Sequence, residues 1–175
     1  MIQLLPIGED VRLETLDQLS AGLAREYRDS CHVREDRLDV SFAFDSVRKQ
    51  YHATSILRDL AGIPGEARIL GVTTVDLCVP IFTFVFGEAQ VAGRAAVVSM
   101  HRLREEFYGL PANPALLGER LLKEAVHELG HTFGLRHCQD WQCAMASSHT
   151  IDRLDLKGIR LCRACRGVAS ANAVK

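Results

Sequence analysis

The chain has 175 residues and a formal net charge of −1, with 47% hydrophobic and 25% charged residues. These values are typical of one soluble globular domain with its own core. The balanced charge gives no electrostatic case for a nucleic-acid partner, and no apolar run approaches the roughly 20 residues of a membrane helix. Because the N-terminus lacks the basic start and small-residue cleavage site of a secretory signal, we expect a cytoplasmic protein. We also expect a monomer without membrane attachment.

The first part of the chain predicts alternating strands and helices. The expected elements are a buried strand at 2–7, a helix at 9–27, a polar strand near 31–40 and a helix from about 46 to 60. Glu9 and Asp10 suit the positive end of the first helix dipole, and Asp45 or Ser46 could cap the second helix. With the strand that follows, the order β-α-β-α-β indicates a sheet with parallel neighbours joined by helical crossovers.

Three further apolar segments predict strands at 68–79, 81–86 and 95–100. The segment 81–86, Ile-Phe-Thr-Phe-Val-Phe, has the strongest strand character in the chain. Gly87 and Gly93 then permit a bulge or a turn. A strand from this region could lie at the edge of the sheet, where it could hydrogen-bond an extended peptide, or the region could form a hairpin within the core.

A long helix is predicted from about 114 to 133, with Asn113 as its N-cap and Pro114 as its first residue. Its apolar stripe consists of Leu122, Val126, Leu129 and Phe133. A second stripe of similar spacing is polar and consists of Arg120, Glu124, His127 and His131. The helix therefore presents a possible metal-binding face that is distinct from its core face.

The central motif of the chain is His-Glu-x-x-His-x-x-Gly-x-x-His, at residues 127–137. On a helix, His127 and His131 share one face and can bind one zinc ion, and Glu128 lies beside them. Gly134 ends the helix and lets the backbone turn, which would bring His137 back to the metal. Three neutral ligands leave a fourth position free for water, as in a catalytic zinc site.

Four of the six cysteines lie near the C-terminus as two close pairs: Cys138 with Cys143, and Cys162 with Cys165. Four thiolates in this arrangement predict a second, structural zinc ion held in a closed tetrahedral site. A redox-active CxxC pair and four reduced free thiols are the alternatives. If both metals bind, adjacent residues His137 and Cys138 belong to different sites, so the second zinc would hold His137 in place.

The stretch from His127 to Cys165 resembles the archaemetzincins, a family in the metzincin clan of zinc peptidases. The resemblance rests on the pattern H-E-x-x-H-x-x-G-x-x-H-C-x4-C-x-M-x16-C-x2-C, with Met145 where the clan has its Met-turn methionine. The last gap is about one residue shorter than in the family, a minor departure in a loop. The part of the chain before this motif is compatible with the family but less specific.

The resemblance implies a metzincin-like α/β (α+β) fold: a mixed, mostly parallel twisted sheet with an antiparallel edge strand, an active-site helix and a small zinc-stapled C-terminal part. We expect residues 1–134 to hold the sheet and the active-site helix, and residues 135–175 to form the C-terminal subdomain, within one compact domain. Two zinc ions are implied, one catalytic and one structural. The ligands implied for them are His127, His131 and His137, and Cys138, Cys143, Cys162 and Cys165, respectively.

The resemblance also implies Glu128 as general base, so the sequence predicts a zinc metallopeptidase, with an aminopeptidase-like activity as one form of it. The alternative is a zinc-stabilised protein that binds peptides with little or no cleavage; a zinc-ribbon nucleic-acid module is disfavoured because its basic tail lacks aromatic residues. The candidates for holding a substrate α-amine are Glu88, Asp140 and Asp76. Candidate helpers in catalysis are Arg136, His32, His52, His101 and His149.

Overall fold

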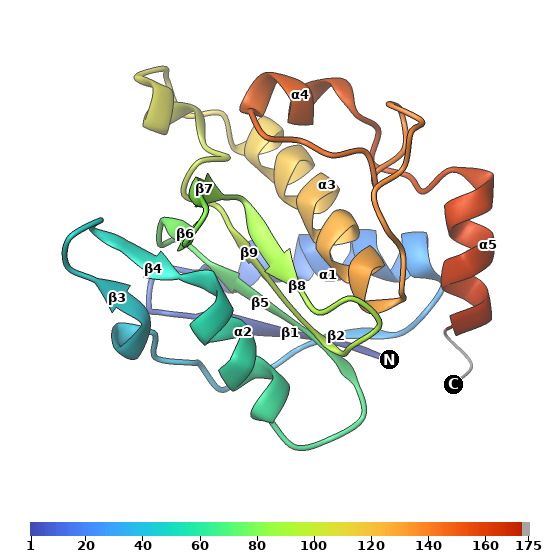
Figure 1. Ribbon diagram of the computed structural model, residues 1–175, viewed down its shortest axis with the longest axis horizontal. Helices are drawn as coiled ribbons and strands as arrows, with labels where there is room; N and C mark the ends of the chain where they lie inside the picture. Colours follow the sequence, from blue (N-terminus) through green and yellow to red (C-terminus); the bar gives the residue numbers. More distant parts are fainter. Residues whose placement is uncertain (173–175) are drawn as a thin grey trace.

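The computed structural model describes residues 1–172, and its main sheet has five strands in the order β2-β1-β5-β9-β8. Their bounds are β1 (Ile2–Ile7), β2 (Cys31–Val33), β5 (Arg68–Thr73), β8 (Gly87–Ala89) and β9 (Ala95–Ser99). Strands β2, β1, β5 and β9 run parallel, and β8 is antiparallel to β9 at the edge (Figure 1). The predicted fold class, a mostly parallel sheet with an antiparallel edge strand, is confirmed.

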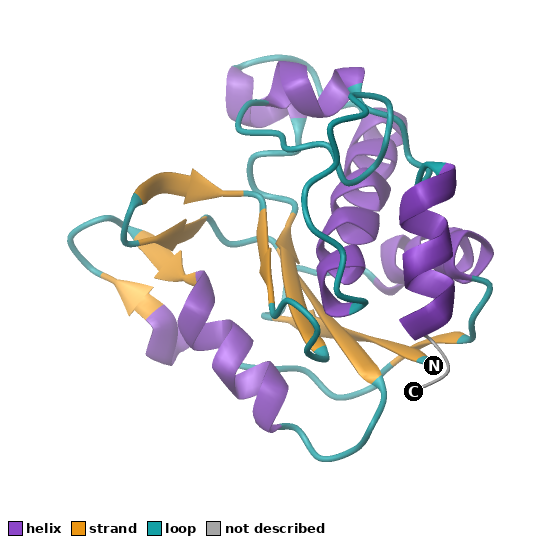
Figure 2. Cartoon of the chain, turned by 45° about the vertical axis from the view of Figure 1, so that its right-hand side comes forward, coloured by secondary structure: helices purple, strands orange, loops and turns teal. Residues whose placement is uncertain are grey.

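Helices cover both faces of this sheet (Figure 2). The helices α1 (Leu13–Tyr27) and α3 (Pro114–Thr132) cover one face, and α2 (Ala53–Gly62) covers the other. Two further helices, α4 (Ile151–Leu156) and α5 (Arg163–Asn172), follow in the C-terminal part. Successive side chains of a strand point to opposite faces, so Leu70 and Val98 pack with α1 and α3, whereas Ile69 and Val97 pack with α2. The three central strands, β1, β5 and β9, are buried on both faces, as expected for parallel strands joined by helices.

A second sheet of four strands, in the order β3-β4-β6-β7, was not predicted. Its strands are β3 (Phe44–Asp45), β4 (Gln50–His52), β6 (Leu77–Val79) and β7 (Phe82–Val85). The predicted strand 68–79 is wrong as one element, because the chain leaves the main sheet after Thr73 and pairs again from Leu77. The apolar segment 81–86 contributes the edge strand β7, and its Phe82 is 49% exposed instead of buried in the core.

Three predicted boundaries differ in the structure. The second helix begins at Ala53 because the Asp45 carboxylate accepts bonds from the Val47 and Arg48 amides, which forms a turn between β3 and β4 in place of a helix start. The first helix begins only at Leu13, after an extended backbone at its N-cap. The polar strand near 31–40 is limited to β2 and one isolated bridge at Leu38.

The helix α3 has the predicted ends. The Asn113 side chain accepts a bond from the Leu116 amide at 3.1 Å, and Pro114 is the first helical residue. Gly134 follows the helix with a φ of +82°, in the left-handed region that glycine tolerates. Leu154 of α4 and Ala169 of α5, two helices that were not predicted, share the core of α1 and α3. Within residues 1–172, no helix has both the length and the apolar character to cross a bilayer.

Candidate active site

The three histidines of the motif come together at the C-terminal end of α3. Their closest ligand atoms all lie within 4.8 Å of one another, and the Nε2 atoms of His127 and His131 are 3.2 Å apart. Two nitrogens bound to one tetrahedral zinc at 2.0–2.1 Å should lie about 3.3–3.4 Å apart. The spacing of these imidazoles therefore fits a zinc ion.

Backbone carbonyls orient two of the rings. Nδ1 of His127 lies 2.9 Å from the Ala144 carbonyl oxygen, and Nδ1 of His131 lies 2.8 Å from that of Leu135. If each Nδ1–H donates to its carbonyl, each Nε2 is left as the acceptor nitrogen that binds a metal. The turn at Gly134 produces the second contact, because it reverses the chain and places Leu135 against the last turn of α3.

Burial favours the neutral form of these ligands. It lowers the pKa of His127 well below the ordinary value, and it also lowers the pKa of His131 and of His137. The positive charge of Lys157 contributes to the shift at His127. Neutral imidazole is the form that binds a metal, so protons compete weakly for this site.

Glu128 lies beneath the edge strand β8. A Cβ added at Gly87 would lie 2.6 Å from the Glu128 Cγ and 2.6 Å from the Val97 carbonyl oxygen, so only glycine leaves room for this carboxylate against the sheet. Burial raises the pKa of Glu128 well above the ordinary value, the charge of Glu124 adds to the shift, and Lys157 opposes it. Like the charge of Lys157, a bound zinc dication would lower this pKa and so favour the ionised carboxylate.

A pocket of about 150 Å³ joins these groups to solvent. One wall consists of the segment Phe84–Gly87, the opposite wall of Ser147, Ser148 and His149, and the floor of Glu124, His127, Glu128 and His137. Among the five candidate helpers, His149 alone lines this pocket. The Ser148 hydroxyl oxygen is buried and has no hydrogen-bond partner within residues 1–172.

The three candidates for an α-amine partner lie away from this pocket. Glu88 points to the other face of β8 and accepts a bond from the Thr54 hydroxyl on α2. Asp76 forms a two-pronged ion pair with Arg102. Asp140 is exposed and accepts a bond from the amide of Gln142. The structure thus brings none of these acids to the histidine cluster.

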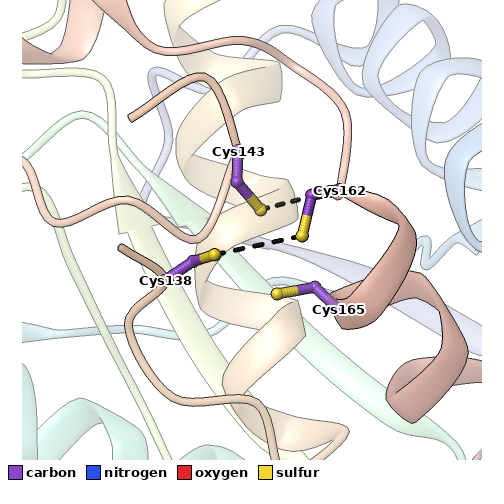
Figure 3. Close-up of side chains that lie close together, drawn as sticks. All are labelled: Cys138, Cys143, Cys162 and Cys165. Atoms are coloured by element: carbon purple, nitrogen blue, oxygen red, sulfur yellow. Dashed lines mark hydrogen bonds between the residues drawn. The ribbon is translucent and has the colours of Figure 1, made fainter. Parts of the chain in front are cut away.

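The four C-terminal cysteines form a second cluster, in which the sulfur atoms turn toward a common centre (Figure 3). The Sγ atoms of Cys138 and Cys162 are 3.9 Å apart, close to the roughly 3.8 Å expected for two sulfurs at 2.3 Å from a tetrahedral zinc. Burial raises the pKa of the Cys143 thiol, and the backbone amides of Cys162 and Met145, which donate to its sulfur, oppose that shift. This cluster also fits zinc.

The two clusters are joined by a short backbone link. The Cys138 amide donates to the Met145 carbonyl oxygen at 2.9 Å, directly beside Ala144, whose carbonyl oxygen faces His127. Met145 is fully buried, and its sulfur contacts the position that a Cβ on Gly130 of α3 would occupy. The segment from Cys138 to Met145 therefore packs against α3 and helps to orient the histidine cluster.

The sequence reasoning missed one charged pair at this site. Lys157 donates to Glu124 at 2.7 Å, and the two side chains are only 1% and 4% exposed. The Lys157 Nζ also lies 3.5 Å from Nδ1 of His127. In the sequence, Lys157 is one residue of the basic C-terminal tail, and no local pattern pairs it with a residue 33 positions away.

Comparison with known proteins agrees with this geometry. The model of peptidase family M54 matches residues 29–169. The archaemetzincin of Methanopyrus kandleri is 42% identical over 149 residues, which cover 84% of this chain and 82% of that protein. The archaemetzincin of Methanocaldococcus jannaschii is 46% identical over 124 residues, which cover 71% of this chain and 68% of that protein.

Two solved structures are similar over nearly their whole length. A zinc-dependent peptidase from Methanocorpusculum labreanum has a TM-score of 0.88 at 32% identity, covering 97% of this chain and 100% of that one. The archaemetzincin of Archaeoglobus fulgidus, complexed with malonate, has a TM-score of 0.82 at 35% identity, covering 95% and 98%.

A histidine-glutamate helix beneath an antiparallel edge strand, on a fold shared with these peptidases, defines a zinc metallopeptidase. The chain belongs to peptidase family M54, and three of the four proteins named above are archaemetzincins. Membership confirms the family that the motif resembled, and it makes peptides or proteins the substrates.

Proposed function

We propose that the chain cleaves peptide bonds with one zinc ion held by His127, His131 and His137 and with Glu128 as general base. The observation that carries this proposal is the convergence of three imidazole nitrogens at zinc-binding spacing, with the Glu128 carboxylate in the same pocket. The outer edge of β8 has no strand partner within residues 1–172. An extended substrate would add to this edge as a further strand and pass over the pocket.

When bound, zinc lowers the pKa of a water molecule and polarises the substrate carbonyl. The buried Glu128 carboxylate would accept a proton from the attacking water and would then pass that proton to the leaving amide nitrogen. The close packing of Gly87 holds the carboxylate under the substrate strand. The Ser148 hydroxyl lines the pocket and has no hydrogen-bond partner among residues 1–172, and we assign it as the donor to the developing oxyanion, with His149 beside it.

A second zinc ion on Cys138, Cys143, Cys162 and Cys165 would be structural, giving two zinc ions per chain. The closed set of four sulfurs leaves no ligand position for substrate. This ion would join the loop that carries His137 to the start of α5. It would thereby hold together the parts of the C-terminal subdomain, from residue 135 onward.

The proposal is tested by incubating zinc-loaded wild type and the Glu128→Ala variant with a mixed peptide library and reading the products by mass spectrometry. Zinc content of both proteins is measured in parallel. Cleavage by wild type alone, with equal zinc in the two proteins, supports the proposed mechanism. Equal cleavage by both proteins would remove Glu128 as the base. Absence of cleavage with zinc present would favour a protein that binds peptides without cutting them.

The same products test the aminopeptidase form of the proposal. Loss of single N-terminal residues supports an aminopeptidase, and internal cuts support an endopeptidase. An aminopeptidase needs an acid for the substrate α-amine. Because Glu88, Asp140 and Asp76 lie outside the pocket, variants of these three acids should leave the cleavage pattern unchanged.

A further inference from the structure

A second cavity, of about 370 Å³, shares no residue with the pocket at the histidine cluster. It lies between α1, α3 and the segment that leads into α5. Its lining residues are Gly22, Arg25, Glu26, Arg28, Leu122, Ile159, Arg160 and Arg166. Four of these eight residues are arginines, and only one is an acid.

The single acid of this cavity is already engaged. Glu26 accepts bonds from the Leu161 amide at 2.9 Å and from the Arg166 guanidinium at 3.1 Å, and its side chain is 9% exposed. It neutralises Arg166 and fixes the chain just before Cys162. Glu26 therefore contributes no free negative charge to the cavity.

The other three arginines carry uncompensated charge. Within the described part of the chain, residues 1–172, Arg25, Arg28 and Arg160 form no ion pair. The Nε atom of Arg166 is buried and has no hydrogen-bond partner within the same residues. Like charges gathered around a concave wall repel one another and focus a positive potential into the cavity, so an anion bound there would be stabilised.

We propose that this cavity binds a phosphate group. Guanidinium groups match the geometry of phosphate oxygens and can bind them through two parallel hydrogen bonds. Among the residues that the structure describes, the lining has no aromatic side chain on which a nucleobase could stack, so the contacts favour the phosphate and not a base. Because Arg160 lies two residues before Cys162, a bound phosphate would tie α1 to the cysteine cluster.

The test is an NMR titration of the ¹⁵N-labelled, zinc-loaded chain with inorganic phosphate at low ionic strength. Saturable shifts are expected at the amides of Gly22 and Ile159, and Arg25→Ala and Arg160→Ala should each weaken binding about tenfold. Arg153→Ala, which removes an exposed arginine outside the cavity, should leave it unchanged. These readouts do not depend on peptidase activity.

Three results would overturn the proposal. One is the absence of saturable shifts at the cavity amides, and another is a shift confined to the histidine cluster, which would mean that phosphate binds only there. The third is an equal loss of phosphate affinity in Arg153→Ala, which would mean diffuse charge attraction.

Co-sedimentation with phosphatidylcholine vesicles, with and without phosphatidic acid, distinguishes the source of the phosphate. If the chain binds the acidic vesicles more tightly and Arg160→Ala removes this difference, the phosphate belongs to a lipid headgroup. If the chain binds both kinds of vesicle equally, the ligand is a free phosphate.

Discussion

The ion pair between Lys157 and Glu124 permits a quantitative prediction. The two side chains are 1% and 4% exposed, and Nζ donates to Oε1 over 2.7 Å. Removing one partner of such a buried pair leaves the other charge without compensation, which costs about 3–5 kcal/mol. We therefore expect Lys157→Met to remove a large part of the roughly 5–15 kcal/mol by which a domain of this size is stable.

The assay is urea unfolding at neutral pH and a fixed, saturating zinc concentration, because bound metal adds to stability by mass action. With a slope of about 2 kcal/mol per molar urea, the Lys157→Met midpoint should fall by about 2 M. The double variant Glu124→Leu/Lys157→Met removes both charges and should lie within about 1 kcal/mol of wild type. Lys123→Met is the matched control. The Lys123 side chain is also buried, at 5% exposed, but its partner Glu119 is 48% exposed and stays hydrated when the lysine is removed, so this variant should lose only about 1 kcal/mol.

Two results would refute this reasoning. A loss of stability in Lys157→Met no larger than in the Lys123→Met control would mean that burial of the partner carboxylate does not increase the cost of losing the lysine charge. The single variants Glu124→Leu and Lys157→Met are each measured alone. If the double variant loses as much stability as these two losses added together, Lys157 and Glu124 contribute independently. Either result would remove the pair as a support of the α3 metal face.

Three other variants test the site. Gly87→Ala places a Cβ 2.6 Å from the Cγ of Glu128, so kcat should fall and thermal unfolding should show a loss of about 1–3 kcal/mol; wild-type kinetics would contradict the close approach. Cys162→Ser should weaken zinc binding at the three histidines about 10- to 100-fold, measured by competition with a chromophoric chelator; unchanged affinity would show that the two clusters are not coupled. Ser148→Ala should lower kcat about 100-fold with little change in KM, unlike Ser170→Ala on α5; equal kinetics in the two variants would exclude Ser148 as the oxyanion donor.

The sequence predicted the features that depend on local geometry. The four-residue spacing of His127 and His131, the cap at Asn113 and the left-handed turn at Gly134 are properties of a single helix and its ends, so they could be read without the fold. The two clusters of possible metal ligands come together as their spacing indicated. The parallel sheet followed from the alternation of strands and helices.

Features that depend on contacts between distant segments required the tertiary structure. The apolar run 81–86 resembles a core strand, but its place at the edge of the second sheet was decided by pairing with β6. The burial of Lys157 against Glu124, and the approach of Gly87 to Glu128, join segments more than 30 residues apart. Burial and strand partners are set by the whole chain, because each depends on which surfaces the other elements leave to be covered.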